Sequence, residues 1–160
     1  MKIIVLSDNH GKTDILYKLM EEHQDAVSFI HCGDIECEPE LFPNLTIVSG
    51  NNDLFYDYPE YQIIQLGGKQ IFIVHGHQFL YHDRLKRMAL KAIELECDIV
   101  CYGHTHVAAH DIINGIHLIN PGSLWRSRDG RAPSYAILTI NEDDINVEHI
   151  FLETKSNKFY

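Results

Sequence analysis

Side chains that bind metals or transfer protons follow apolar runs at five places along the chain. Asp8 and His10 come directly after the run KIIVL, and later runs lead into HCGD, SGNND, VHGH and YGHTH. Each stretch alone is typical of a turn, because Asp, Asn and Gly favour chain reversal. Five such stretches in succession, each with a glycine, indicate a shared site instead. Its candidate residues are Asp8, His10, Asp34, Asn51, His75, His77, His104 and His106.

This set of residues favours metal chemistry over a covalent nucleophile. A Ser–His–Asp triad needs only one histidine, and no Ser or Cys here lies in a nucleophile-elbow sequence. A single zinc ion takes three or four ligands, which leaves several candidates unused. Two divalent ions that share a bridging carboxylate would use them all. Mixed imidazole and oxygen ligands suit manganese, iron, cobalt or zinc better than calcium.

The elements that would position these side chains alternate between strand-like and helix-like patterns. A strand–helix–strand unit opens the chain, and hairpin-connected strands follow, with turns at Gly67-Gly68 and Asn114-Gly115. This order predicts an α/β fold in which two mixed β-sheets pack as a sandwich with flanking helices. Ligands of such sheets bind beyond the carboxyl ends of the strands, where the polar stretches lie. The expected strands span residues 2–6, 27–30, 45–48, 61–66, 70–74, 99–102, 107–113, 116–119, 135–140 and 145–151, and the expected helices span about 13–23 and 82–95.

Length and composition predict one domain spanning residues 1–160, with disorder expected only in the polar tail KSNKFY. The chain carries 13 Lys plus Arg against 23 Asp plus Glu, a formal charge of −10, which disfavours a nucleic-acid polymer as partner. The N-terminal apolar run is too short for a signal peptide, and no run approaches the roughly 20 residues of a membrane helix. We therefore expect a cytoplasmic protein with no membrane partner, whose 4 cysteines are reduced core residues.

The ordered stretches SDNHG, HCGDIE, GNND, HGHQ, GHTH and INPGS resemble the calcineurin-type metallophosphoesterase superfamily. Within it they look like the small YfcE-type phosphodiesterase branch, which is also similar to the eukaryotic retromer subunit that keeps the fold as a scaffold. The resemblance spans about residues 1–140. Each motif alone is weakly specific, whereas the ordered combination is highly specific. The INPGS turn is expected to shape the floor of the site rather than to react.

The resemblance implies two metal positions joined by a bridging carboxylate. The first would be held by Asp8, His10, Asp34 and His106, and the second by Asp34, Asn51, His75 and His104. Asp34, Asn51 and His104 would act in catalysis through the metals, and His77 would lie near the site. Manganese is the first choice, with nickel, magnesium, iron, cobalt and zinc as alternatives. Residues two apart in an extended segment point to one side, so we expect Asp8 with His10, and His104 with His106, to share a side.

One position departs from the family pattern. Many superfamily members carry a histidine after the Gly-Asn pair that protonates the leaving group, whereas this chain carries Asn52. Asparagine cannot donate a proton at physiological pH, and general-acid assistance is typically worth about 10²- to 10⁴-fold. We therefore expect modest turnover, or a preference for leaving groups that are stable as anions. Asn52 and Arg126 are expected to contact the substrate. The alternative for Arg126 and Arg128 is that they are solvated charges on a loop. Asp53 is expected to orient a metal ligand by a hydrogen bond.

Together these features predict a dinuclear metal-dependent phosphodiesterase in which a hydroxide that bridges the metals attacks a small phosphodiester, such as a nucleotide. The alternative is a protein-binding scaffold of the retromer-subunit type with little or no activity. Every metal-ligand position of the family pattern is present in this chain, which favours the enzyme. A phosphomonoesterase or a nuclease would share the metals and differ in the pocket. The resemblance also suggests a homodimer.

Overall fold

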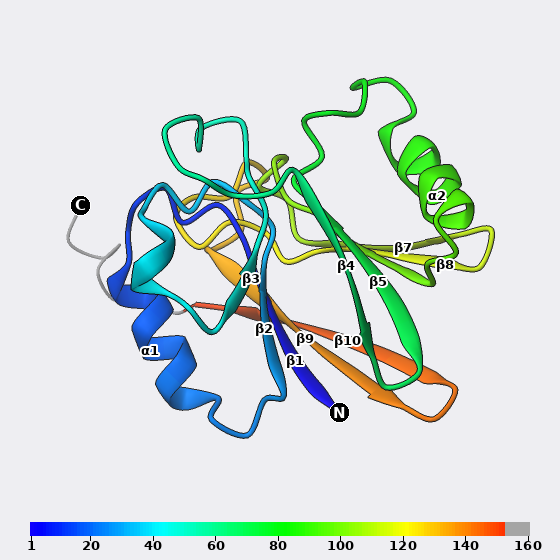
Figure 1. Cartoon of the computed structure of the whole chain (residues 1–160), viewed down its shortest axis with the longest axis horizontal. Helices are drawn as coiled ribbons and strands as arrows, with labels where there is room; N and C mark the ends of the chain where they lie inside the picture. Colours follow the sequence, from blue (N-terminus) through cyan, green and yellow to red (C-terminus); the bar gives the residue numbers. More distant parts are fainter. Residues whose placement is uncertain (153–160) are drawn as a thin grey trace.

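Two five-stranded β-sheets pack face to face, and one helix covers the outer face of each sheet (Figure 1). This computed structural model describes residues 1–152, so the expectation of a disordered tail falls outside the described residues. The elements in chain order are β1 Lys2–Leu6, α1 Asp14–Glu22, β2 Ser28–His31, the 3-10 helix η1 Pro39–Leu41, β3 Leu45–Ile47, β4 Tyr61–Leu66, β5 Lys69–Val74, α2 Arg84–Glu94, β6 Ile99–Cys101, β7 Ala109–Ile113, β8 Ile116–Asn120, β9 Ser134–Asn141 and β10 Asp144–Phe151.

The first sheet has the strand order β10-β9-β1-β2-β3, with β1 at its centre. Ile4 of β1 lies opposite Phe29 of the parallel strand β2 and opposite Ile137 of the antiparallel strand β9. Both faces of β1 are buried, which explains why its sequence is a continuous apolar run. Helix α1 packs Leu16 and Leu19 against one of these faces.

The second sheet has the strand order β4-β5-β6-β8-β7, with antiparallel hairpins at both edges and parallel pairs in the middle. Both hairpin turns have two successive residues with positive φ, as a two-residue turn of type I′ requires. The φ angles are 59° and 77° at Gly67 and Gly68, and 52° and 78° at Asn114 and Gly115. Both predicted hairpins are confirmed.

The core lies between the two sheets and is built mainly from β-branched and leucine side chains. Helix α2 adds a second apolar layer through Met88, Ala89 and Ala92. All four cysteines are free and buried, as expected. The predicted fold class, two mixed sheets in a sandwich with flanking helices, is confirmed. The residues at the centre of the core include Ile3, Val5, Ile30, Ile71, Ile73, Ile99 and Leu138.

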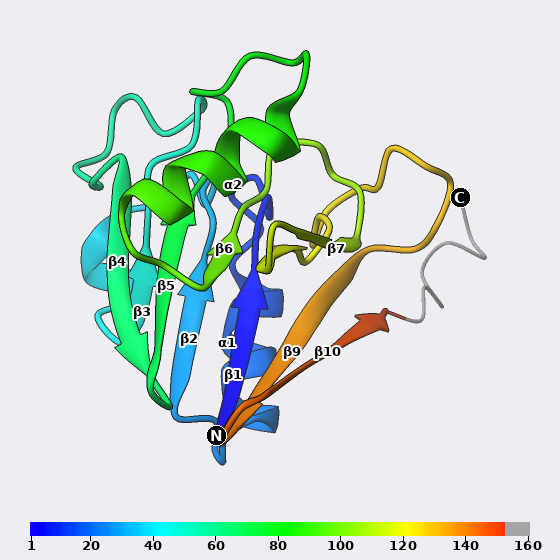
Figure 2. The same cartoon turned by 90° about the vertical axis from the view of Figure 1, so that its right-hand side faces the viewer.

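The topology brings the carboxyl ends of six strands to one edge of the sandwich. Strands β1, β2 and β3 are parallel within the first sheet, and β5, β6 and β8 are parallel within the second. In Figure 2 the arrows of β1 and β2 point to the top of the view, where the connecting loops gather, and the N-terminus lies at the bottom. The polar stretches of the sequence follow these strands, so they share that edge. Within residues 1–152, no helix is long and apolar enough to cross a membrane.

Candidate metal centre

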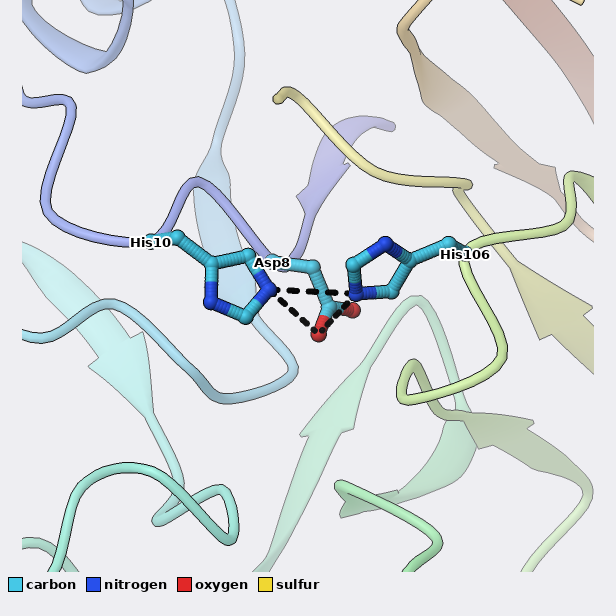
Figure 3. A group of neighbouring side chains, drawn as sticks. All are labelled: Asp8, His10 and His106. Atoms are coloured by element: carbon cyan, nitrogen blue, oxygen red, sulfur yellow. Dashed lines mark hydrogen bonds and ion pairs between the residues drawn. The ribbon is translucent and has the colours of Figure 1, made fainter. Parts of the chain in front are cut away.

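Three predicted ligands converge from the loops that follow β1 and β6. Oδ1 of Asp8 lies 3.3 Å from Nε2 of His106 and 3.8 Å from Nε2 of His10. The two imidazole nitrogens lie 3.1 Å apart, and Figure 3 shows all three side chains pointing toward one another. Ligand atoms about 2.1 Å from one ion stand roughly 3 Å apart, so these distances suit a shared cation. We call Asp8, His10 and His106 the first ligand group.

A second ligand group lies beside the first and shares Asp8 with it. Nε2 of His75 lies 3.3 Å from Oδ2 of Asp34 and 3.8 Å from Oδ1 of Asp8. Oδ1 of Asn51 lies 3.0 Å from Nε2 of His75 and 3.1 Å from Nδ1 of His104. The four residues predicted for the second position therefore meet. Asp8 is common to both groups by distance, and the bridging role of Asp34 stays a prediction.

Three of the histidines are oriented by a hydrogen bond on the ring nitrogen that faces away from the site. The partner is a carbonyl or carboxylate oxygen, which can only accept, so Nδ1 carries the proton and donates it. Nε2 then presents its lone pair to the site, the arrangement typical of metal-ligating histidines. The pairs are His10 with the Glu36 carboxylate at 2.6 Å, His75 with the Cys32 carbonyl at 2.7 Å, and His106 with the Arg126 carbonyl at 2.8 Å.

The side-chain atoms that face one another are hydrogen-bond acceptors, so they suit a cation. Oδ2 of Asp8 accepts from the Ser7 hydroxyl at 2.6 Å and from the backbone N–H of His104 at 3.0 Å. Oδ1 of Asp8 is buried and receives no hydrogen bond from the described residues. An unpaired buried carboxylate oxygen is costly, and a positive ion is the partner that would satisfy it.

The charges in the two groups are set by burial and by the neighbouring groups. Burial raises the pKa of Asp34, but the adjacent His75 ring outweighs burial and holds the pKa below its usual range. Burial likewise raises the pKa of Asp8, and the adjacent His106 and His75 rings lower it further than burial raises it. Burial lowers the pKa of His75, whereas Asp34 and Asp8 raise it above its ordinary value.

The pKa of His104 shifts in the opposite direction from that of His75. Burial and the charge of His75 lower the pKa of His104 to about 4. The ring is therefore neutral at pH 7 and has a lone pair available for a metal.

The expectation of extended segments at the ligands is wrong. Five ligands have left-handed backbone conformations instead, which cost an L-residue roughly 1–2 kcal/mol each. Residues held in such conformations cluster at functional sites. The turns bring Asp8 and His10 to one group, while His104 and His106 contribute to different groups. The φ angles are 55° at Asp8, 47° at His10, 58° at Asp34, 72° at His104 and 61° at His106.

Glycines let the backbone approach the ligands closely. A Cβ atom at Gly50 would overlap the Asp34 carboxylate, and one at Gly103 would overlap the Ser7 hydroxyl and lie 2.6 Å from Oδ2 of Asp8. Side chains at these positions would displace the carboxylates. The glycines of SGNND and YGHTH are therefore required by the close approach to the site.

Buried Asp53 holds the Asp34 loop in place. Its carboxylate accepts from the backbone N–H groups of Asp34 at 2.7 Å, Gly50 at 2.7 Å and Glu36 at 2.8 Å. Asn52 adds two further hydrogen bonds to the Asp34 carboxylate, from its backbone N–H at 2.9 Å and its side-chain amide at 3.2 Å. Asp53 thus orients a ligand by hydrogen bonding, as expected. Asn52 contacts Asp34 in this structure, and its contact with substrate stays a prediction.

The remaining candidates lie around the two groups. His77 is exposed, with its ring centre 5.4 Å from that of His75 and 6.2 Å from that of His104, so it lies beside the second group. The Arg126 guanidinium lies 5.1 Å from the Trp125 ring centre. Nη1 of Arg128 donates to the His104 carbonyl at 3.3 Å. The catalytic role of His77 and the phosphate contact of Arg126 stay predictions.

One supporting residue, Glu36, was assigned no role by sequence reasoning. Glu36 orients His10, and the only signal for it was a carboxylate two residues after Asp34 in the stretch GDIE. Ser123, in the INPGS turn, donates its hydroxyl to the Asp8 carbonyl at 2.7 Å. That contact supports the expectation that this turn shapes the floor of the site.

Glu36→Gln is expected to weaken metal binding at the first ligand group by about 10- to 100-fold, because an amide is a weaker acceptor for Nδ1–H of His10. Titration calorimetry of the metal-free protein with Mn²⁺ or Zn²⁺ measures the change. Glu38→Gln, at an exposed carboxylate two residues further on, is the matched control. Equal effects of the two substitutions would contradict the role of Glu36.

Buried His31 predicts a pH dependence of stability. Its ring accepts from the Gly33 N–H and donates to Asn9 Oδ1, and burial lowers its pKa from 6.5 to about 3. The unfolded chain binds a proton below pH 6.5 that the folded protein does not, so the free energy of unfolding falls as pH drops from 6.5 toward 3. At pH 5 this loss is about 2 kcal/mol.

Urea unfolding of the metal-free protein at pH 7 and pH 5 measures this loss. The variant His31→Gln is expected to lose less stability between these two pH values than the wild type. The same pH-dependent loss in both proteins would show that His31 is not its source.

Comparison with known proteins places this geometry in a family. Residues 1–143 match the calcineurin-like phosphoesterase superfamily domain. The probable metallophosphoesterase YsnB of Bacillus subtilis is 36% identical over 151 residues, which cover 92% of this chain and 89% of YsnB. Phosphodiesterase MJ0936 of Methanocaldococcus jannaschii is 31% identical over 144 residues, covering 76% of this chain and 83% of MJ0936. A predicted phosphoesterase from Streptococcus pneumoniae has a solved structure with a TM-score of 0.88 and 31% identity, covering 94% of this chain and 88% of that one.

Two solved structures at lower identity share the fold. Vps29 of Entamoeba histolytica in complex with zinc has a TM-score of 0.72 at 22% identity, covering 94% of this chain and 98% of Vps29. YfcE, a phosphoesterase from E. coli, has a TM-score of 0.66 at 21% identity, covering 96% and 100%. The resemblance inferred from the sequence motifs is confirmed, and the chain belongs to the calcineurin-like phosphoesterase superfamily.

Proposed function

We propose that this protein is a metal-dependent phosphodiesterase that hydrolyses a small phosphodiester, such as a nucleotide, with two divalent ions. The observation that carries the proposal is the pair of ligand groups that share Asp8 and present acceptor atoms to one another. The name of the phosphodiesterase MJ0936, a relative at 31% identity, supports the same class of reaction.

We propose manganese as the first choice among the divalent transition metals that the ligand types suit. Each group combines imidazole nitrogens with carboxylate oxygens, and Asn51 adds an amide oxygen to the second. Such mixed ligands suit divalent transition metals. When bound, the two ions lower the pKa of a shared water toward neutrality and stabilise charge on the phosphoryl oxygens.

Residues of the chain determine the charge of the site and hold its side chains in fixed orientations. Asp8 and Asp34 contribute two negative charges, fewer than the positive charges of two divalent ions, so the loaded site attracts an anionic phosphate. The hydrogen bonds to Asp34 from Asn52 hold its carboxylate in one orientation. A fixed orientation lets a nucleophile and a phosphorus atom meet without reorganisation of the protein.

The position after the Gly-Asn pair supplies no proton to the leaving group. Asn52 cannot act as an acid, and its side-chain amide donates to Asp34. The leaving oxygen therefore departs as an anion or takes its proton from solvent. We propose a preference for diesters with acidic leaving alcohols. We also propose a cytoplasmic location, since the four buried thiols are free, as in a reducing compartment.

A protein-binding scaffold is the second candidate, and exposed apolar side chains in two loops favour it. Leu54 and Phe55 in the loop after β3 are 82% and 95% exposed, and Leu80 and Tyr81 in the loop after β5 are 66% and 90% exposed. Such side chains are available to a protein partner. In a scaffold the two converging ligand groups would have no role, and for this reason we favour the enzyme.

The test uses metal-stripped protein and bis(p-nitrophenyl) phosphate, with Mn²⁺, Mg²⁺, Ni²⁺ or Zn²⁺ returned one at a time. We expect Mn²⁺ to restore hydrolysis and Asp34→Asn to lower kcat/KM by more than about 100-fold, since the substitution removes a charged ligand. Asp143→Asn is the matched control, because Asp143 is an exposed carboxylate in the β9–β10 turn.

Two outcomes would contradict the proposal in different ways. If no metal raises hydrolysis above the level of Asp34→Asn, the protein is not a metal-dependent phosphodiesterase, and the scaffold becomes the better account. If calorimetry with excess Mn²⁺ detects no binding, the two ligand groups do not form a metal site.

A further inference from the structure

Trp125 is the only tryptophan of the chain, and it lies beside the first ligand group with 40% of its surface exposed. Its ring centre lies 5.1 Å from that of His10 and 6.4 Å from that of His106, in edge-on arrangements. A large aromatic side chain gains free energy when it is buried, and this one remains partly open to solvent. Its exposed surface is therefore available to a molecule bound at the metal centre.

Hydrogen bonds fix Trp125 relative to the metal ligands. Its backbone N–H donates to the Ser123 hydroxyl at 3.0 Å, and that hydroxyl donates to the Asp8 carbonyl at 2.7 Å. The next residue, Arg126, accepts at its carbonyl from Nδ1 of His106 at 2.8 Å. The backbone of Trp125 thus has a defined position with respect to both Asp8 and His106. Such preorganisation lowers the entropy cost of binding a ligand.

Positive charge accompanies this ring. The Arg126 guanidinium carbon lies 5.1 Å from the Trp125 ring centre, in cation–π contact. Arg128, three residues after Trp125, adds a second positive charge beside the site, where its Nη1 donates to the His104 carbonyl at 3.3 Å. A π face combined with arginine suits a ligand that carries both a planar base and a phosphate.

We propose that Trp125, backed by Arg126, is the platform on which the base of a nucleoside phosphodiester stacks while its phosphate reaches the metal centre. The inference rests on the proposed function and adds the residue that selects the substrate. The platform borders the metal centre, since its ring centre lies 5.1 Å from that of His10. A diester whose non-leaving group is not planar leaves Trp125 exposed and gains nothing from it.

The test compares two diesters with the same leaving group, thymidine 5′-(p-nitrophenyl phosphate) and methyl p-nitrophenyl phosphate. The nucleoside preference is the ratio of their kcat/KM values. We expect Trp125→Leu to lower this ratio about tenfold, which corresponds to about 1.4 kcal/mol. Trp125→Phe, which keeps an aromatic face, is expected to retain most of it.

Phe55→Leu is the matched control, because Phe55 is an exposed aromatic residue in the loop that follows Asn51. Its ratio is expected to stay at the wild-type value. An equal loss of kcat/KM for both diesters in Trp125→Leu would show a merely structural role. A ratio that falls in Phe55→Leu and not in Trp125→Leu would place the platform elsewhere.

The single tryptophan gives a second readout that does not require turnover. With Mg²⁺ present, thymidine 5′-monophosphate is expected to quench the emission of Trp125 saturably, and ribose 5-phosphate is expected to leave it nearly unchanged. If neither diester is hydrolysed, the proposed function fails, and the fluorescence titration still decides the platform. Saturable quenching by the nucleotide alone supports it, whereas equal responses to both phosphates, or no response, overturn it.

Discussion

Asp8 Oδ1 is a buried carboxylate oxygen that receives no hydrogen bond from the described residues, and nitrogens of His10, His75 and His106 face it within 3.8 Å. Such a cluster is unfavourable in isolation, because each acceptor has left water without gaining a donor. The fold can hold it because β1, which leads directly into Asp8, is paired on both sides and buried on both faces. Affinity for a cation is therefore built into the metal-free fold.

The backbone around the site carries a second cost. Five left-handed ligands, at roughly 1–2 kcal/mol each, together cost an amount comparable to the whole net stability of a typical domain. Relaxation is prevented by backbone hydrogen bonds between the ligand loops, from the N–H of Asp8 to Gly33 and from the N–H of His10 to Asp34, both at 3.0 Å. The inter-sheet core supplies the compensating free energy. Backbone strain and repulsion between the acceptor atoms thus occur together, at the edge of the sandwich where the parallel strands of both sheets end.

Local patterns explain which features the sequence could predict. Apolar runs and two-residue glycine turns depend on neighbouring residues, so β1 and β4 begin and end at the predicted residues. Convergence of the ligands was also predictable, because it follows from the parallel order of the strands. The contact between Glu36 and His10 joins residues 26 apart, and the Ser123 contact to Asp8 joins residues 115 apart. No local signal specifies such pairs. The extended geometry assumed for Asp8 and His10 failed because loop-to-loop hydrogen bonds, rather than strand alternation, set their conformation.

The net charge bears on the class of substrate that we propose. A formal charge of −10 opposes the approach of a long polyanion, whereas Arg126 and Arg128 lie beside the proposed metal centre. With divalent ions bound, the proposed site would attract a small phosphate ester, and the net negative charge of the chain would oppose an extended one.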